Sequence, residues 1–251
     1  MDPAPRPSRG VALTERRDPL VVAHRGTWSA APQNSLAALE GAIAVGCDMV
    51  ELDVRRTRDG HLVAVHDPRI QGTRVGTLDH AQLKARLGPR QAPSLVEVLE
   101  RATGRIKLDI ELKEDGYVEQ VTAAVAEHLS PDGYVMTSFL PPVLTAIKEH
   151  APEIRTGLLL KPPGAVGLER RLQRSRADFL APHARLARAG LLAWATERGL
   201  QSYVWTVNHR RMLHALLDDP RVAAVITDRP GDALAHRASA RALHREASKA
   251  A

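Results

Sequence analysis

Short apolar runs and segments with helical periodicity alternate along most of the chain. The apolar runs predict strands over residues 19–24, 48–54, 62–66, 106–112, 134–138, 155–160, 178–181, 201–206 and 222–227. Apolar positions three and four residues apart predict helices over residues 36–45, 80–87, 94–103, 117–129, 141–150, 166–175, 185–198 and 209–217. Alternating strands and helices indicate an α/β protein with a parallel sheet, and about eight such units fit a closed (β/α)8 barrel, the TIM barrel.

One connection departs from this pattern. Only seven residues, 55–61, join the strand 48–54 to the strand 62–66, whereas a parallel crossover with a helix needs about a dozen. We therefore expect a somewhat distorted barrel with no helix between strands 2 and 3, joined by an extended return or by a hairpin. The nine strand candidates exceed the eight that a barrel needs, so one is peripheral, and the sequence does not specify which.

No linker divides the chain, so we expect a single barrel domain over residues 19–235. The Pro- and Arg-rich residues 1–18 are expected to be flexible, and residues 236–251 to form a basic tail. Hydrophobic residues make up 44% of the chain and charged residues 25%. Both values are ordinary for a globular protein and argue against disorder.

The composition also limits the expected partners and location. The formal net charge of +6 could attract nucleic acid or a phosphate-bearing substrate. The arginines are scattered, however, and no basic stripe contains aromatics, so we expect no nucleic acid. The single cysteine, Cys47, excludes a disulfide within the chain and a cysteine metal cluster. No apolar run has the length of a signal peptide or a bilayer span, so we expect a cytoplasmic protein without stable membrane insertion. The oligomeric state cannot be predicted.

Carboxylates stand in pairs on two of the predicted strands. Side chains alternate between the faces of a strand, so Glu51 and Asp53 share one face. On the fourth predicted strand the same alternation groups Asp109, Glu111 and Lys113. Buried like charges are unfavourable unless a cation compensates them, and Glu51, Asp53 and Glu111 suit one hard divalent ion, Mg²⁺ or Ca²⁺. Asp109 either orients a ligand or only forms a salt bridge, and both alternatives stay open.

Histidines and cations stand at strand ends, where barrel enzymes place their chemistry. His24 and His66 each end a predicted strand beside an ionisable neighbour, which suits a general acid and a general base. Arg25 and Lys113 could hold an anionic oxygen, and Arg offers a bidentate fork. Together with a metal, these groups favour phosphoryl chemistry. His183 also ends a strand and could reach the rim of the site, although we expect it to be exposed to solvent.

Several short motifs follow one another in a specific order. They are His24-Arg25-Gly26, Pro32-Gln33-Asn34-Ser35, Glu51-Leu52-Asp53-Val54, Thr57-Arg58-Asp59-Gly60, His66-Asp67, Glu111-Leu112-Lys113, Ser138-Phe139, Trp205-Thr206-Val207-Asn208 and Thr227-Asp228-Arg229-Pro230. In these motifs, across about residues 20–235, the chain resembles the glycerophosphodiester phosphodiesterase family. The resemblance implies a metal-dependent barrel enzyme that hydrolyses glycerophosphodiesters to glycerol 3-phosphate and an alcohol.

Carried over by position, the resemblance implies a role for each candidate residue. The implied roles are metal ligation by Glu51, Asp53 and Glu111, acid–base catalysis by His24 and His66, phosphate contact by Arg25 and Lys113, and a pocket wall formed by Trp205. Two features depart from the family pattern. Gln33 stands where the family usually has glutamate, which removes a charge from the site. The segment between Asp67 and Ile106 has no room for the small inserted domain of some members, so substrate specificity stays open.

Two other functions stay open. One is a phospholipase-D-like hydrolysis of lysophospholipids or sphingomyelin on a similar barrel, which would need an apolar channel and membrane contact. The sequence contains no obvious lipid-binding helix. The other is a catalytically weak protein that binds a phosphate ligand, with Gln33 as its first sign, although the complete carboxylate and histidine sets argue against it. Neither the alcohol headgroup nor the nucleophile, water or a neighbouring substrate hydroxyl, follows from the sequence.

Overall fold

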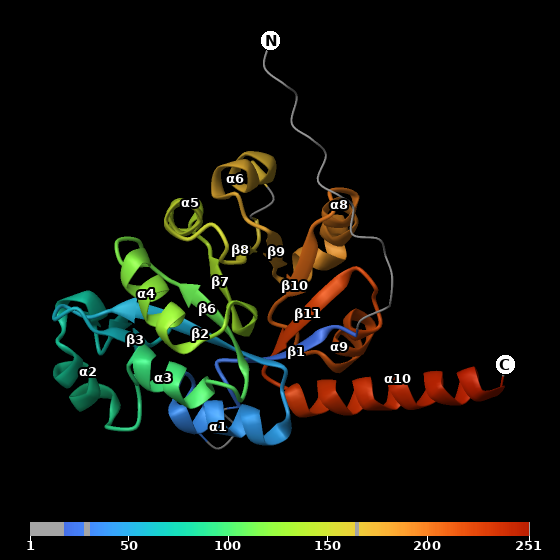
Figure 1. Cartoon of the computed structure of the whole chain (residues 1–251), viewed down its shortest axis with the longest axis horizontal. Coiled ribbons are helices and arrows are strands. Elements are labelled where there is room, and N and C mark those ends of the chain that lie inside the picture. Colours follow the sequence, from blue (N-terminus) through green and yellow to red (C-terminus); the bar gives the residue numbers. More distant parts are fainter. Residues whose placement is uncertain (1–17, 28–30, 164–165, 251) are drawn as a thin grey trace, which may run out of the picture.

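A closed ring of parallel strands forms the centre of the computed structural model, which describes residues 18–27, 31–163 and 166–250 (Figure 1). The strands of the ring are β1 (Leu20–His24), β2 (Met49–Arg56), β6 (Lys107–Leu112), β7 (Tyr134–Ser138), β8 (Thr156–Leu160), β9 (Phe179–Pro182), β10 (Gln201–Val204) and β11 (Val222–Thr227). Strand β1 pairs with both β2 and β11, which closes the ring. The predicted (β/α)8 barrel is confirmed.

Helices lie outside the ring (Figure 1). They are α1 (Leu36–Val45), α2 (His80–Leu87), α3 (Leu95–Ala102), α4 (Val118–His128), α5 (Pro141–His150), α6 (Leu168–Ser175), α7 (Ala184–Leu186), α8 (Leu192–Glu197), α9 (Arg210–Leu217) and α10 (Pro230–Ala250). Ser35 caps α1, and Ser94 with Glu97 forms a capping box at α3. The single helix predicted over residues 185–198 is wrong, because a π-turn with Gly190 at a φ of 93° separates α7 from α8.

The short connection after β2 is a hairpin. Strand β3 (Leu62–Ala64) runs antiparallel to β2 and lies outside the ring, so the run 62–66 is the peripheral strand candidate. Within the turn, the Thr57 hydroxyl donates to Asp59 Oδ1 (2.6 Å), and Gly60 takes a positive φ of 86°. The segment that follows contains β4 (Arg69–Ile70), β5 (Thr73–Arg74) and the 3₁₀ turn η1 (Val75–Thr77) before α2 and α3 lead to β6.

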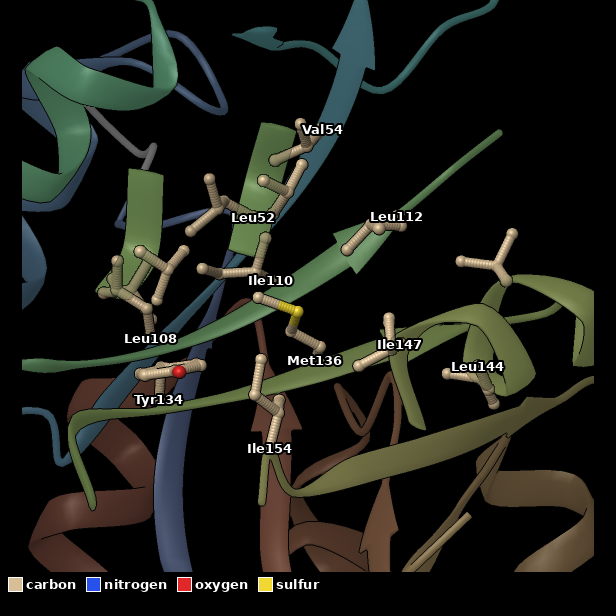
Figure 2. Close-up of a cluster of buried hydrophobic side chains, with 14 of the residues drawn as sticks. Leu52, Val54, Leu108, Ile110, Leu112, Tyr134, Met136, Leu144, Ile147 and Ile154 are labelled. Carbon is tan, nitrogen blue, oxygen red and sulfur yellow. The ribbon is translucent and has the colours of Figure 1, made fainter. Parts of the chain in front are cut away.

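Two apolar layers cover the two faces of the ring. Outward-facing side chains such as Leu52, Ile110 and Met136 pack against the surrounding helices (Figure 2). Inward-facing side chains fill the barrel toward the amino ends of the strands. There the ring centroids of Phe179 and Tyr203 lie 4.3 Å apart. Along the same inward rows, the carboxyl ends of the strands carry polar and charged residues instead, which places the candidate site at that end of the barrel.

Helix α10 continues across the domain boundary predicted at residue 235 and projects away from the barrel (Figure 1). Arg237 pairs with Asp48, and Arg241 pairs with Asp18, so the first part of the predicted basic tail is tied to the barrel. Of the segment 1–18 that was predicted to be flexible, residues 1–17 lie outside the described residues. Of the described helices, none combines the length and the apolar character needed to cross a bilayer.

Replacing Gly157 by alanine should destabilise the barrel. A Cβ on Gly157 would lie 2.3 Å from the ring of Phe179, which is fully buried. Overpacking of this kind should lower the free energy of unfolding by roughly 1–3 kcal/mol. Denaturant unfolding followed by circular dichroism measures it, with Gly231→Ala as the control, because nothing lies within 4 Å of a Cβ there. Equal stability of the two variants would contradict the packing argument.

Candidate active site

Strands β2 and β6 bring carboxylates together on the inner face of the barrel. In their parallel register Glu51 lies beside Asp109, and Asp53 lies beside Glu111. One oxygen from each of Glu51, Asp53 and Glu111 lies within 4.8 Å of the other two, and all three side chains are buried. The structure therefore brings together the three predicted metal ligands.

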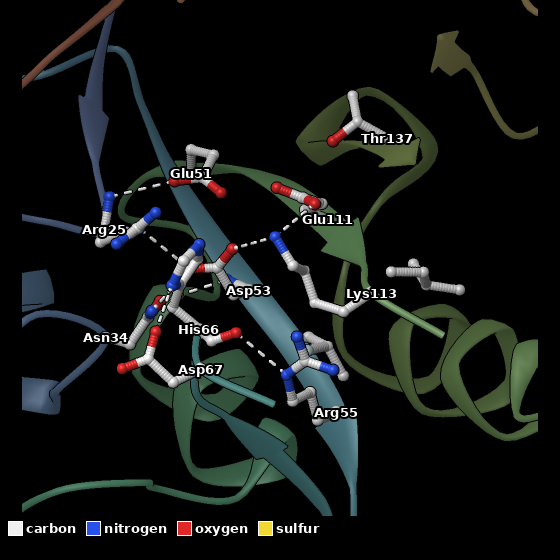
Figure 3. Close-up of polar contacts among 12 residues, drawn as sticks. Arg25, Asn34, Glu51, Asp53, Arg55, His66, Asp67, Glu111, Lys113 and Thr137 are labelled. Atoms are coloured by element: carbon white, nitrogen blue, oxygen red, sulfur yellow. Dashed lines mark hydrogen bonds and ion pairs between the residues drawn. The ribbon is translucent and has the colours of Figure 1, made fainter. Parts of the chain in front are cut away.

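The carboxylate of Asp53 is well compensated. Lys113 Nζ lies 3.1 Å from Asp53 Oδ1, Arg25 Nε lies 3.0 Å from Oδ2, and the Asn34 amide donates to Oδ2 at 2.8 Å (Figure 3). Burial by itself would raise the pKa of Asp53, but these two cations and the Asn34 amide hold it below its ordinary value. The predicted phosphate-binding residues Arg25 and Lys113 thus stand on either side of one carboxylate.

Glu51 and Glu111 are less well compensated. Glu51 lies 3.9 Å from His24 Nε2, and within the described part of the chain the one hydrogen bond that its side chain accepts comes from the Arg25 backbone N–H, at 3.2 Å. Burial, followed by repulsion from Asp53 and Glu111, raises the pKa of Glu51 well above its ordinary value. Burial also raises the pKa of Glu111 to about 7, although Lys113 Nζ lies 2.6 Å from its Oε1. This excess of buried negative charge fits a hard divalent cation.

The fourth inward carboxylate, Asp109, lies beneath this cluster. Its Oδ1 accepts a hydrogen bond from the Thr137 hydroxyl at 2.8 Å, and its buried Oδ2 has no partner in the described part of the chain. Burial raises the pKa of Asp109 to about 7. Among the described residues Asp109 forms no salt bridge, so the salt-bridge alternative finds no support.

His24 is held in place by the last strand of the barrel. Its Nδ1 lies 2.7 Å from Asp228 Oδ1, and Asp228 Oδ2 accepts a hydrogen bond from the Asn208 amide at 2.6 Å. The backbone N–H of Asp228 donates in turn to Asn208 Oδ1 at 3.0 Å. Sequence reasoning gave Asp228 and Asn208 no role. The signal in the sequence was an acidic residue directly after the last barrel strand. In a closed barrel the last strand pairs with the first, so this residue comes close to the end of the first strand.

His66 reaches the site through the hairpin and not from a strand of the ring. The N–H of Val65 donates to the carbonyl of Asp53 at 2.9 Å, which sets the next residue, His66, beside Asp53 (Figure 3). His66 Nδ1 lies 2.8 Å from Asp67 Oδ1, and Arg55 Nε donates to the His66 carbonyl at 3.0 Å. Burial lowers the pKa of His66, which favours its neutral form.

The loop after β1 explains two of the sequence motifs. Arg25 takes a left-handed φ of 59°, and a Cβ on Gly26 would lie 2.6 Å from the backbone of Ala38 in α1, so only glycine fits there. Asn34, also left-handed, bridges the loop to β2, because its Oδ1 accepts from the Asp53 N–H at 3.1 Å. Gln33 Oε1 accepts from Arg25 Nη1 at 2.7 Å. The glutamine therefore still orients Arg25, although it brings no charge.

Aromatic rings form the opposite side of the site. The indole of Trp205 donates to the Ala181 carbonyl at 2.6 Å and stands edge-on to both the Phe139 ring (5.4 Å between centroids) and the His183 ring (5.2 Å). His183 is half-buried, because its ring packs edge-on against Trp205, so it is less exposed than expected and reaches the rim of the site. Sequence reasoning did not connect the two, since they follow different strands.

Comparison with known proteins agrees with this geometry. Residues 24–232 match the model of the glycerophosphoryl diester phosphodiesterase family. A glycerophosphodiester phosphodiesterase of Caldanaerobacter subterraneus subsp. tengcongensis is 29% identical, over 84% of this chain and 94% of that protein. The crystal structure of a glycerophosphodiester phosphodiesterase from Parabacteroides distasonis has a TM-score of 0.76 at 25% identity, covering 89% of this chain and 98% of that one.

A second solved structure shares the fold. It is that of an Oleispira antarctica phosphodiesterase in complex with the product sn-glycerol-3-phosphate, with a TM-score of 0.77 at 24% identity over 87% of this chain and 96% of that one. The family match covers nearly all of the barrel described above and includes both strands that carry the carboxylates. The chain therefore belongs to the glycerophosphoryl diester phosphodiesterase family.

Proposed function

We propose that this member of the family is a metal-dependent phosphodiesterase that hydrolyses glycerophosphodiesters to glycerol 3-phosphate and an alcohol, with His24 and His66 as its acid–base pair. The observation that carries the proposal is the buried cluster of Glu51, Asp53 and Glu111, with cationic and imidazole groups around it. The product bound to the Oleispira antarctica phosphodiesterase is consistent with this substrate class.

The chain's own cations would hold the phosphate. The Lys113 ammonium and the Arg25 guanidinium flank Asp53, so phosphate oxygens lying between them would form charge-assisted hydrogen bonds. A divalent ion, which we propose is Mg²⁺ or Ca²⁺, would be held by the three carboxylates and would stabilise negative charge on the phosphoryl oxygens. The Asn34 and Gln33 contacts would keep Asp53 and Arg25 in position for this task.

Each histidine is arranged to move a proton at Nε2. When Nδ1–H of His24 donates to Asp228, the neutral ring has its lone pair on Nε2. Asp67 has the same relation to His66 Nδ1, and the lowered pKa of His66 leaves its ring neutral near pH 7 and able to accept a proton. One histidine would serve as base and the other, once protonated, as acid for the leaving alcohol.

The cytoplasmic location and the small-molecule partner also belong to this proposal. A glycerophosphodiester is a small molecule, so the proposed reaction requires no macromolecular partner. Fractionation of cells that express the chain, followed by immunoblotting, tests the location.

Release of glycerol 3-phosphate from a glycerophosphodiester should require a divalent ion. EDTA should abolish the release, and added Mg²⁺ or Ca²⁺ should restore it. His24→Ala and His66→Ala should each lower kcat by roughly 10²- to 10⁴-fold, because each removes a proton-transfer group. An enzyme-coupled glycerol 3-phosphate assay measures this, with His150→Ala, an exposed residue at the end of α5, as the control. Full activity of His66→Ala would remove the mechanism, and phosphate binding without turnover in the wild type would favour the binding-protein alternative.

Glu51→Gln should separate charge repulsion from metal binding. It keeps the size of the side chain but removes a buried charge, so the metal-free variant should be at least as stable as the metal-free wild type. The wild type should gain about 2.7 kcal/mol at a metal concentration of 100 times Kd, and the variant should gain almost none. Thermal unfolding with and without metal measures both effects, and Glu100→Gln on the exposed face of α3 is the control. A variant that keeps the full metal-induced rise in Tm would contradict the assignment of Glu51.

Asp228→Asn should affect catalysis more than binding. The variant loses the charge and has one acceptor oxygen for two donors, His24 Nδ1–H and the Asn208 amide, so the His24 tautomer is no longer selected. As a result kcat should fall at least about tenfold with little change in KM. Asn208→Ala should produce a smaller loss in the same direction, because it removes only the support of Asp228. Steady-state kinetics of the two variants test this order. An increase in KM at constant kcat would show that Asp228 acts on binding instead.

A further inference from the structure

One side of the barrel mouth is formed by connections that carry aromatic and basic groups. Phe139, Lys161, His183 and Trp205 directly follow β7, β8, β9 and β10, in the same alternation that turns Asp53 and Glu111 inward. The short connections that they open, residues 139–140, 161–167, 183 and 205–209, contain no Asp or Glu. The carboxylates of the site come instead from the strands on the other side.

Two ammonium groups lie near the Phe139 ring. Lys161 Nζ is 5.3 Å from the ring centroid, and Lys113 Nζ is 5.8 Å from it. Lys113 also pairs with Asp53 and Glu111. Lys161 is exposed and has no carboxylate partner among the described residues, so its charge acts on whatever enters this side of the mouth. The aromatic wall that would attract an ammonium ligand by cation–π contact is thus next to the protein's own cations.

His183 adds a neutral donor to the same wall. Its Nδ1 accepts a hydrogen bond from the Arg185 N–H at 3.2 Å, so the neutral ring carries its proton on Nε2. Burial, followed by the charge of Arg185, lowers the pKa of His183 and favours that neutral form. Hydroxyl and carboxylate oxygens can accept hydrogen bonds from this N–H and from Lys161. A quaternary ammonium group has no acceptor and cannot bond to either donor.

We propose that the wall formed by Phe139, Lys161, His183 and Trp205 receives the alcohol headgroup of the substrate and selects for neutral polyol or anionic headgroups over cationic ones. Lys161 is the residue that sets this selectivity. The inference rests on the proposed phosphodiesterase function and names the substrate class within it. A cationic headgroup on this wall would face like charge, and the connections that carry the wall contain no Asp or Glu to compensate it, whereas a polyol would find donors.

Comparison of two substrates that differ in headgroup charge tests the proposal. For the metal-loaded full chain, kcat/KM should be about tenfold higher for glycerophosphoglycerol than for glycerophosphocholine, and added salt should reduce this ratio. Lys161→Glu should change the ratio about tenfold or more in favour of glycerophosphocholine, and Lys161→Met should have an intermediate effect. Lys107→Glu makes the same charge change at the exposed amino end of β6 and should leave the ratio unchanged.

The outcomes separate the two proposals. Turnover of both substrates with a ratio that is the same in the wild type, Lys161→Glu and Lys107→Glu would overturn the assignment of the wall but not the phosphodiesterase function. A wild-type preference for glycerophosphocholine would also overturn it. Absence of glycerol 3-phosphate release from every glycerophosphodiester, with metal present and the chain folded by circular dichroism, would instead contradict the proposed function on which the inference rests.

Discussion

Burial of several carboxylates on two neighbouring strands is the constraint on which the site depends. Because β2 and β6 pair in parallel register, Glu51, Asp53 and Glu111 face the same interior, and a shift by one residue would turn them against the helices. The chain offsets part of this charge with Lys113 from the end of β6 and Arg25 from the end of β1. Both cations lie close to Asp53, so they compensate the charge of Glu51 less well. The Glu51 carboxylate accepts a hydrogen bond from a backbone N–H. A bound divalent ion would remove that imbalance, and the same cations would then be free to hold a phosphate.

The hairpin after β2 also positions a residue of the site. A helical crossover at this point would carry the chain away from the barrel mouth. The antiparallel return through β3 instead brings the chain back to the level of Asp53, where the Val65 N–H bonds to the Asp53 carbonyl and His66 follows. Tyr117 stabilises the neighbouring end of β2, since its hydroxyl donates to the Val54 carbonyl at 2.6 Å and accepts the N–H of Lys113 at 3.1 Å. One peripheral strand therefore explains both the surplus strand candidate and the position of the second histidine.

The periodicity of the sequence was enough to predict the ring of strands, and its ordered motifs were enough to predict the family, because both signals are local. The contacts of Asp228 could not be predicted in this way, since it meets His24 across 204 residues of sequence and only closure of the ring brings them together. The role of the left-handed Asn34 could not be predicted for a different reason. A polar residue directly before a helix is also typical of a helix cap, and only the structure shows the Asn34 amide bonded to Asp53. The break at Gly190 was missed because one glycine inside an apolar periodic segment is a weak signal.

The central claim is that the carboxylate cluster binds a divalent ion next to a phosphate held by the chain's cations. Anomalous diffraction from crystals grown with Mn²⁺ and glycerol 3-phosphate tests it most directly. We expect one anomalous peak coordinated by Glu51, Asp53 and Glu111, with the phosphate against Arg25 and Lys113. A well-ordered site with no anomalous peak among these three carboxylates at saturating Mn²⁺, or a phosphate bound away from both cations, would contradict it.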